Sequence, residues 1–218
     1  MNILELFAGT ASFSRVAEFY GHDTYTIDND PIFKTDKVMD IMDLTADNIP
    51  RPTLDGIPLD IDILWASPPC TSFSQSGVWK HWDYFTPKTD FAVQSLELIR
   101  KTIELIDELE PRYWFIENPR SILRKFPEMK ELPIRVEVCY CRYGEFRMKP
   151  TDIWTNLETW EPRPFCYNGC KDHITAERGS TTGSQGMGKA ESARVPQLLC
   201  LEILEAVKID MEAENDKV

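Results

Sequence analysis

The stretch that decides the fold is residues 2–28, NILELFAGTASFSRVAEFYGHDTYTID. It begins with an apolar segment that stops at Gly9, which is typical of a buried strand. A helical pattern follows, with Thr10 or Ser12 near its N-cap. A second short strand closes the stretch and ends in Asp28. Strand, helix and strand in immediate succession predict a parallel βαβ unit.

The rest of the chain continues this alternation. A long helix begins at about Thr89, with apolar residues at helical spacing, and Pro111 ends it. The pattern predicts an α/β fold with a doubly wound, mostly parallel, Rossmann-like sheet. Further strands are expected at residues 36–43, 60–70 (whose last residues enter a loop), 112–119, 134–144 and 151–157, further helices at 121–129 and 196–209, and a solvated tail at 209–218.

The composition is ordinary for a globular protein. The chain has 218 residues, of which 42% are hydrophobic, and this suffices for one core. No apolar run approaches the roughly 20 residues that span a bilayer, and the N-terminus lacks the basic and apolar regions of a signal peptide. We therefore expect a cytoplasmic protein with no membrane contact. In that compartment the six cysteines are expected to be free, metal-bound or catalytic rather than paired.

The formal net charge of −12 argues mildly against binding to nucleic acid, because phosphate contacts need a basic face. Lysine and arginine nevertheless cluster at residues 120–149. The cluster has two interpretations of equal weight, a phosphate-binding surface and scattered surface charge.

The expected strand ends carry a set of ligand-binding candidates. In an open α/β sheet, ligands bind beyond the carboxyl ends of the strands. Gly9 allows a close backbone approach, Phe7 could lie against a flat ring, and Asp28 and Asp40 could accept hydrogen bonds from a ribose and an adenine amino group. Each alone has a plain alternative, a turn glycine or a solvated acid. Together they predict a nucleoside-shaped site, and the lack of a multiple-glycine fingerprint disfavours NAD.

The loop SPPCTSFSQSG, residues 67–77, places a thiol in stiff and polar surroundings. Pro68 and Pro69 fix the backbone ahead of Cys70, and Thr71 and the serines supply polar contacts. Cys70 could be a structural thiol, half of a disulfide, a metal ligand or a nucleophile. Its place beyond a strand end favours the nucleophile.

Glu117 follows four apolar or aromatic residues and precedes Asn118 and Pro119. A carboxylate at such a strand end is partly desolvated, which suits it to hold and donate a proton. The alternative is a carboxylate that caps a helix or pairs with a cation. A thiol and an acid that face one pocket suit covalent addition to an electron-poor ring.

In this order, ELFAGTASFS, ASPPCTSFSQSG and FIENP resemble the cofactor loop, the Pro-Cys loop and the Glu-Asn motif of cytosine carbon-5 DNA methyltransferases. YGEFRMKPTDIWTN is similar to the later Tyr-Gly and Arg motif, and SARVPQLLCLEIL to the C-terminal segment. The resemblance covers residues 1–155 and 190–208, and the compact length is similar to that of bacteriophage and prophage members. It implies a class I S-adenosylmethionine-dependent methyltransferase fold.

The resemblance also implies a mechanism. The Cys70 thiolate adds to carbon-6 of a cytosine that has left the helix stack, Glu117 contacts ring N3 and the exocyclic amine, and Arg147 holds the ring. Carbon-5 then takes the methyl group of S-adenosylmethionine, a base removes the carbon-5 proton, and the thiol leaves. On the same match the cofactor site comprises Phe7, Ala8, Gly9, Thr10, Asp28, Asn29, Asp40, Ile41 and Pro68, and the substrate site comprises Pro69, Ser72, Ser74, Asn118 and Lys149.

The chain departs from the family pattern at several positions. Ala11 and Ser12 stand where the family often has glycines, and Pro119 replaces the usual valine after Glu-Asn. The Gln-x-Arg-x-Arg pattern of the family is reduced here, so the role of Arg147 is assigned on an incomplete motif. The insert that would recognise the target is short. We expect a catalytic domain of residues 1–155 and 190–212, interrupted by a Cys- and Gly-rich insert at 156–189.

The insert contains CYNGCKDH, which brings Cys166, Cys170 and His173 within one loop. Such spacing occurs in small zinc sites, and Cys139 or Cys141 could supply a fourth ligand. Free thiols in a reducing cytoplasm are the favoured interpretation. The following Gly/Ser-rich stretch, with Arg178 and Lys189 nearby, is either a flexible surface loop or an approach to DNA.

The sequence thus predicts a monomeric DNA cytosine-5 methyltransferase that acts on duplex DNA with S-adenosylmethionine in a bacterial or phage-infected cell. The first alternative keeps the chemistry but takes tRNA as substrate. The second is a catalytically dead relative that binds nucleic acid, against which the presence of Cys70 and Glu117 argues.

Overall fold

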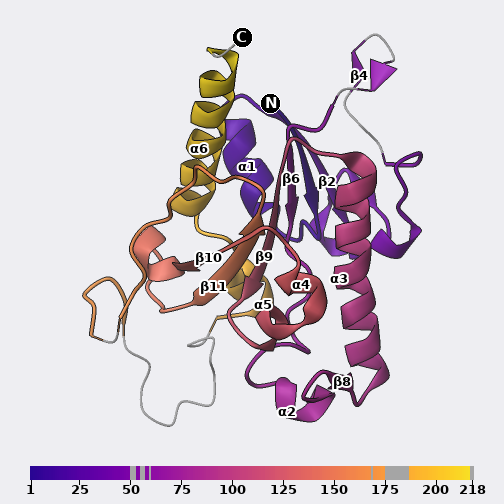
Figure 1. Cartoon of the computed structure of the whole chain (residues 1–218), viewed down its shortest axis with the longest axis vertical. Helices are drawn as coiled ribbons and strands as arrows, with labels where there is room; N and C mark the ends of the chain where they lie inside the picture. The colour runs from indigo at the N-terminus through magenta and orange to yellow at the C-terminus, as the bar shows by residue number, and fades with distance from the viewer. Residues whose placement is uncertain (50–52, 55–56, 59, 168, 175–186, 217–218) are drawn as a thin grey trace.

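The computed structural model describes residues 1–49, 53–54, 57–58, 60–167, 169–174 and 187–216. Its centre is a seven-stranded sheet in the order β10-β11-β9-β6-β1-β2-β3 (Figure 1). All pairs from β9 to β3 are parallel, and β11 runs antiparallel to both β9 and β10. The strands are β1 Asn2–Leu6, β2 Asp23–Asp28, β3 Lys37–Val38, β6 Ile63–Ala66, β9 Tyr113–Pro119, β10 Ile134–Cys139 and β11 Pro150–Thr155. The predicted mostly parallel α/β sheet is confirmed.

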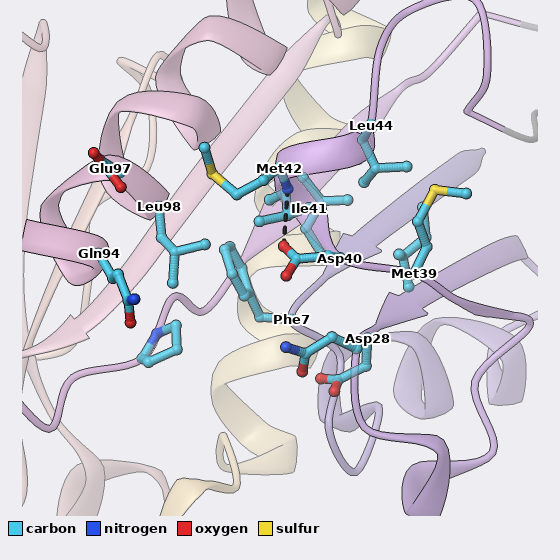
Figure 2. A pocket seen from close by; sticks show the side chains of 14 residues that line it. Phe7, Asp28, Met39, Asp40, Ile41, Met42, Leu44, Gln94, Glu97 and Leu98 are labelled. Atoms are coloured by element: carbon cyan, nitrogen blue, oxygen red, sulfur yellow. Dashed lines mark hydrogen bonds between the residues drawn. The ribbon is translucent and has the colours of Figure 1, made fainter. Parts of the chain in front are cut away.

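The order of the strands creates a switch point at β1. The chain moves from β1 to β2 and β3 on one side, and then returns to place β6 on the other side of β1. Leu6 pairs with Ala66, and Ala66 with Ile116, so the loops that follow β1, β6 and β9 emerge side by side. Ligands of open α/β sheets bind at such a point, and Figure 2 shows the pocket that opens there.

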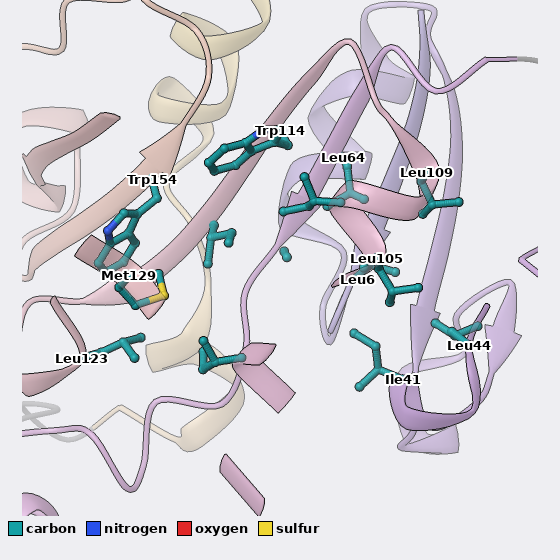
Figure 3. Close-up of a cluster of buried hydrophobic side chains, with 14 of the residues drawn as sticks. Leu6, Ile41, Leu44, Leu64, Leu105, Leu109, Trp114, Leu123, Met129 and Trp154 are labelled. Atoms are coloured by element: carbon teal, nitrogen blue, oxygen red, sulfur yellow. The ribbon is translucent and has the colours of Figure 1, made fainter. Parts of the chain in front are cut away.

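Helices cover both faces of the sheet because its strands alternate between two cores. In β6, Ile63 and Trp65 enter the core under α1 (Ser12–Phe19) and α6 (Gln197–Asn215), whereas Leu64 enters the core under α3 (Asp90–Leu109). Figure 1 shows α1 and α6 together on one side and α3 on the other. Figure 3 shows Leu64 of the sheet in the same cluster as side chains of α3.

Several elements differ from the sequence predictions. The strand expected at 36–43 ends at Val38, because the Asp40 carboxylate accepts a hydrogen bond from the Met42 N–H and starts the 3-10 turn η2, Ile41–Asp43. The helix expected at 121–129 is split at Pro127 into η3, Ile122–Lys125, and α4, Pro127–Lys130. The strand expected at 134–144 gives way to η4, Tyr140–Tyr143.

The predicted tail is instead the end of α6, which continues to Asn215. Its acidic residues find partners on the sheet, and this holds the last turns. Tyr113 donates a hydrogen bond to Asp210 at 2.9 Å, and Arg112 forms an ion pair with Glu214. Elements that the sequence did not suggest are the hairpins β4–β5 (Thr53–Leu54, Ile57–Pro58) and β7–β8 (Trp82–Asp83, Thr86–Pro87), the 3-10 turn η1 Pro31–Phe33, and the short helices α2 Val78–His81 and α5 Lys189–Ala193.

A buried glutamate begins α1, in place of the predicted cap at Thr10 or Ser12. The N-cap residue is Ala11, which makes no side-chain cap bond. The Glu5 carboxylate of β1 accepts hydrogen bonds from the N–H groups of Phe13, at 3.4 Å, and Ser14, at 2.8 Å. Burial raises the pKa of Glu5 to about 7.

This carboxyl group should make the stability of the protein depend on pH. Its pKa is higher in the folded than in the unfolded chain, so the stability it contributes is complete in acid and is lost as the pH rises through about 7. We expect the free energy of unfolding of the native chain, and with it the Tm, to fall between about pH 5 and about pH 8. Glu5→Gln should remove up to about 3 kcal/mol of that loss of free energy. Thermal unfolding across this range, with the exposed Glu18→Gln as control, measures it; equal pH dependence in all three proteins would contradict the assignment.

Candidate active site

The loop after β1 winds tightly around the end of the strand. Phe7, Gly9 and Ala11 have φ angles of 54°, 49° and 52°, so left-handed residues alternate along it. The Gly9 N–H donates to the Asp28 carboxylate at 2.9 Å, and the Asp30 N–H donates to the other oxygen of Asp28 at the same distance. Asp28 therefore ties the loop of β1 to the end of β2, and the aromatic ring of Phe7 is directed by a strained backbone.

A cavity of about 400 Å³ lies beyond these strand ends. Figure 2 shows the ring of Phe7 between Leu98 of α3 and Asp40. This size is in the range of small-molecule sites. The lining residues are Leu6, Phe7, Ile27, Asp28, Asn29, Met39, Asp40, Ile41, Met42, Leu44, Pro69, Gln94, Glu97 and Leu98.

The charge of this cavity limits what it can bind. Its described lining contains three carboxylates, of Asp28, Asp40 and Glu97, and neither lysine nor arginine. Phosphate groups would be repelled, whereas a cation is attracted. The aromatic and aliphatic walls suit a flat base. The donor set therefore fits a nucleoside that bears a positive charge, as the sulfonium of S-adenosylmethionine does.

The structure brings together five of the predicted cofactor residues in this lining, namely Phe7, Asp28, Asn29, Asp40 and Ile41. The other four stand behind it. Ala8 and Pro68 are buried, Gly9 shapes the loop, and Thr10 faces a separate cavity beside Ser12 and Gln197. Pro69, predicted for the substrate, lines the cofactor cavity instead.

The loop that follows β6 folds into consecutive turns around Cys70. The Cys70 carbonyl accepts hydrogen bonds from the N–H groups of Phe73, at 3.1 Å, and Ser74, at 2.9 Å. Gly77 closes the loop, because a Cβ atom there would lie 2.2 Å from the Thr71 carbonyl oxygen. Cys70 is half-buried, and no disulfide involves it.

The charges around Cys70 have opposite effects on its thiol. Burial raises the pKa of Cys70, the negative charge of Glu117 raises it further, and the positive charge of Lys149 lowers it. Glu117 and Lys149 lie near the Cys70 loop, because Lys149 Nζ is 3.8 Å from Glu117 Oε1 and Asn118, the residue after Glu117, donates to the Pro68 carbonyl of that loop. In the free protein Cys70 is held as the neutral thiol, and loss of the Glu117 charge would favour the thiolate.

Glu117 has a hydrogen-bond partner that the sequence did not reveal. The Tyr140 hydroxyl donates to Glu117 Oε1 at 2.7 Å, and Lys149 Nζ lies 3.8 Å from the same oxygen. Lys149 Nζ also stands 4.3 Å from the centre of the Tyr140 ring. Burial and the Glu117 charge raise the pKa of Tyr140 well above its usual range, so this hydroxyl remains a donor.

We expect Tyr140→Phe to slow catalysis without weakening cofactor binding. A hydrogen bond to a charged group is worth about 1.5–3 kcal/mol, which corresponds to roughly 10- to 100-fold in rate if Glu117 acts in the slow step. Single-turnover methylation at several pH values measures the loss of rate. It also measures the shift of the pH–rate profile that is expected if Tyr140 positions Glu117. Tyr113→Phe is the matched control, because that hydroxyl donates to the carboxylate of Asp210 in α6; equal rates for the two variants would contradict the role.

Arg147 is buried and already occupied. Its Nε donates to Glu145 at 2.6 Å, and its Nη2 donates to the Ser192 carbonyl at 2.7 Å. Lys149 Nζ donates to the same carbonyl at 3.3 Å. Both basic residues therefore fasten α5, the element that follows the insert, to the start of β11.

The remaining predicted substrate residues fall into two groups. Ser74 is used within its loop, since its hydroxyl donates to the Thr71 carbonyl at 3.0 Å. Asn118 and Ser72 each have a buried oxygen, Oδ1 and Oγ, that lacks a partner within the described structure. The Asn118 amide donates to the Pro68 carbonyl at 2.9 Å, which ties β9 to the Cys70 loop.

Most of the basic cluster at 120–149 is internally paired. Arg120, Arg124 and Arg135 form ion pairs with Glu137 of β10, and Arg124 and Arg135 also pair with the buried Asp152 of β11. These arginines stabilise the antiparallel edge of the sheet, which favours the surface-charge interpretation over phosphate contacts for this group.

The predicted insert is described in part. Its residues Cys166, Cys170 and His173 lie together with Cys141. Of the two cysteines offered as a fourth ligand, Cys139 belongs to the end of β10 and lies outside this group, whereas Cys141 belongs to η4. Arg178, predicted to approach DNA, lies outside the described residues, as does the side chain of Lys189.

Sequence reasoning missed Tyr140 and the α3 contribution to the cavity. Gln94, Glu97 and Leu98 lie far along the chain from the other lining residues and belong to an amphipathic helix. The helical pattern indicates which face is buried, but not which exposed residues overhang a neighbouring loop. Tyr140 sits between two cysteines in a stretch predicted as a strand, and nothing in its spacing marked it.

Comparisons with known proteins identify a family for the chain. The family model described as C-5 cytosine-specific DNA methylase matches residues 1–134. A probable DNA (cytosine-5)-methyltransferase of Frog virus 3 (isolate Goorha) is 30% identical over 229 residues, which cover 94% of this chain and 99% of the viral protein.

A solved structure with a TM-score of 0.50 supports the fold. A putative DNA modification methyltransferase encoded within an E. coli prophage has a TM-score of 0.50 at 18% identity, over 71% of this chain and 46% of that one, so the chain spans less than half of its length. The S. pombe Dnmt2 methyltransferase has a TM-score of 0.47 at 18% identity, over 71% of this chain and 50% of that one. Across the described residues, no helix is long and apolar enough to cross a membrane. The family match and the viral relative together show that the chain belongs to the C-5 cytosine-specific DNA methylases.

Proposed function

We propose that this protein transfers a methyl group from S-adenosylmethionine to carbon-5 of cytosine in duplex DNA, through a covalent bond between Cys70 and the base. The observation that carries the proposal is the meeting of Cys70, Glu117 and Lys149 beside a carboxylate-lined nucleoside pocket. Membership of the C-5 cytosine methylase family supplies the reaction class. S-adenosylmethionine, when bound, supplies the methyl group.

The residues of the pocket divide the work of holding the cofactor. Phe7 and Leu98 would enclose the adenine between an aromatic and an aliphatic wall. The carboxylates of Asp28 and Asp40 would accept hydrogen bonds from hydroxyl and amino groups, and their negative charge would favour the sulfonium. Pro69 belongs both to this lining and to the Cys70 loop, which brings the two halves of the reaction together.

Formation of the nucleophile is coupled to arrival of the base. In the free protein burial, and after it the negative charge of Glu117, raise the pKa of Cys70 and keep the thiol protonated. When cytosine binds, the proton of the Cys70 thiol is taken up by the pair formed by the Glu117 carboxylate and ring N3, which neutralises the Glu117 charge. The Cys70 sulfur then bonds to carbon-6, the 5,6 double bond opens, and its electrons are delocalised toward the protonated N3. Carbon-5 becomes nucleophilic and takes the methyl group. A base then removes the carbon-5 proton, the 5,6 double bond forms again, the carbon–sulfur bond breaks, and the departing thiolate recovers the proton held at N3.

The short insert, residues 156–189, is proposed to contact the target, with residues 1–155 and 190–212 as the catalytic domain. Its first part is fastened to the catalytic domain near η4, since the Arg163 N–H donates to the Tyr143 hydroxyl at 3.0 Å and the Ile174 N–H to the Phe146 carbonyl at 2.6 Å. Few residues are then available to read bases, so we expect a short recognition sequence. We propose that the protein works as a monomer inside a bacterial or phage-infected cell.

Radiolabelled S-adenosylmethionine tests the substrate. The purified protein is incubated with duplex DNA of mixed sequence or with tRNA, beside Cys70→Ala as the matched control. We expect label in the DNA, as 5-methylcytosine, and none with the variant. Label confined to tRNA would show that tRNA, and not DNA, is the substrate. Label transferred to nucleic acid by the Cys70→Ala variant would refute the proposed mechanism.

A further inference from the structure

Four metal-binding side chains meet at one point outside the active site. Cys166 Sγ lies 3.0 Å from Cys170 Sγ, and His173 Nδ1 lies 3.1 Å from Cys170 Sγ and 3.4 Å from Cys166 Sγ. With Cys141 Sγ, the four donor atoms are all within 4.8 Å of one another. Among the described residues this is the one group of three or more such side chains arranged in this way.

The donor set matches that of a closed structural metal site. Three sulfurs and one imidazole nitrogen form the Cys₃His set, which zinc binds as a tetrahedron with Zn–S bonds of about 2.3 Å. Such bonds place the sulfurs about 3.8 Å apart, and the spacing seen here needs only a slight expansion. The three cysteines are buried, so the site has no open position for a substrate.

The chain contributes these ligands from two separate segments. Cys141 comes from η4, directly after β10, whereas Cys166, Cys170 and His173 come from one short loop of the insert. Backbone hydrogen bonds hold this part of the insert at its two ends, from the Arg163 N–H to the Tyr143 hydroxyl and from the Ile174 N–H to the Phe146 carbonyl, and between them the cysteines have a small apolar cluster. Met148 and Phe165 are the side chains packed around the cysteines, and the Arg142–Asp172 ion pair crosses between the same two segments. So small an apolar cluster stabilises a loop poorly without a cross-link.

We propose that Cys141, Cys166, Cys170 and His173 bind one zinc ion, which fastens the insert to the catalytic domain. Binding displaces the protons of the three thiols, and His173 binds through Nδ1 as the neutral imidazole. Zinc and three thiolates together carry one negative charge.

The site stands next to the catalytic machinery in sequence. Cys141 follows Tyr140, whose hydroxyl holds Glu117, and precedes Arg142, which donates to the Pro164 carbonyl at 3.0 Å. A metal at Cys141 would therefore fix η4 from one side while Glu117 fixes it from the other. On the proposed function, this sets the position of the insert relative to the flipped base.

Metal analysis of the whole protein tests the proposal independently of any methylation. The chain is purified without chelator in the presence of a thiol reductant, and its metals are measured by mass spectrometry. We expect about one zinc per chain. Protein grown with cobalt should show the absorption of a tetrahedral thiolate-bound cobalt(II) ion.

Variants then identify the ligands. Cys166→Ala and His173→Ala should lose the metal, while His173→Cys should keep it with an altered cobalt spectrum. Cys139→Ala is the matched control, because Cys139 is equally buried and lies 3.5 Å from Cys141 Sγ but outside the group of four. Folded native protein that holds no zinc and takes up no cobalt would overturn the proposal, as would a Cys166–Cys170 disulfide in the reduced preparation or loss of metal from Cys139→Ala alone.

Discussion

Replacing Cys70 by alanine should abolish methylation and leave cofactor binding intact. The sulfur is the atom that would bond to carbon-6, and no other described side chain at the site is a thiol. Loss of a covalent nucleophile costs a rate factor on the order of 10⁴ or more. Single-turnover transfer of label to duplex DNA measures the chemical step.

Cofactor affinity separates loss of the nucleophile from loss of the fold. Cys70 does not line the cofactor cavity, so calorimetry should give the same Kd for S-adenosylmethionine in Cys70→Ala and in the native chain. Cys200→Ala removes a buried thiol far along the chain and should retain activity. Methylation by Cys70→Ala at a rate close to the native one would show that another group attacks the base.

Replacing Glu117 by glutamine should cause the second-largest loss of methylation rate. The same change should make the Cys70 thiol more reactive. The amide can still accept the Tyr140 hydrogen bond, but it cannot share a proton with the base, so we expect the methylation rate to fall by about 10²- to 10⁴-fold. The same change removes the negative charge that raises the pKa of Cys70. Alkylation of Cys70 at fixed pH should therefore become faster.

Peptide mass spectrometry after timed alkylation measures the second effect, because it identifies Cys70 among the six cysteines. The reaction of the native thiol should quicken as pH rises toward its raised pKa, and that of Glu117→Gln should reach the same rate at lower pH. Glu137→Gln removes an acid that is paired with arginines and should leave Cys70 unchanged. Slower alkylation in Glu117→Gln would contradict the assigned charge coupling.

The site residues that lie at the ends of strands could be predicted from the sequence. Because β1, β6 and β9 are adjacent and parallel, three motifs separated by more than forty residues open at the same edge, and their order predicts the pocket. Phe7 directly follows β1, Cys70 lies in the loop after β6, and Glu117 lies near the carboxyl end of β9. Local sequence patterns thus predict where a site residue lies when the strands that carry the motifs are adjacent and parallel.

What lies beyond the strand ends depends on packing that no local pattern records. The sequence leaves the arginines at 120–149 equally open to phosphate contacts and to scattered surface charge, and only the antiparallel register of β10 and β11 sets Glu137 and Asp152 beside them. The tail at 209–218 shows no sign that it completes α6, because the partners of Asp210 and Glu214, Tyr113 and Arg112, are about a hundred residues away. Residues 212–216 are nevertheless exposed, as a solvated segment would be.

Trapping of Cys70 on 5-fluorocytosine tests the central claim most directly. Duplex DNA that carries this base at the target site is incubated with the protein and S-adenosylmethionine, because fluorine at carbon-5 blocks the final proton loss and preserves the adduct. We predict a denaturation-resistant protein–DNA complex whose digested peptide carries the methylated base on Cys70. A protein that methylates ordinary DNA but forms no such complex, or forms it through another residue, would contradict covalent attack by Cys70.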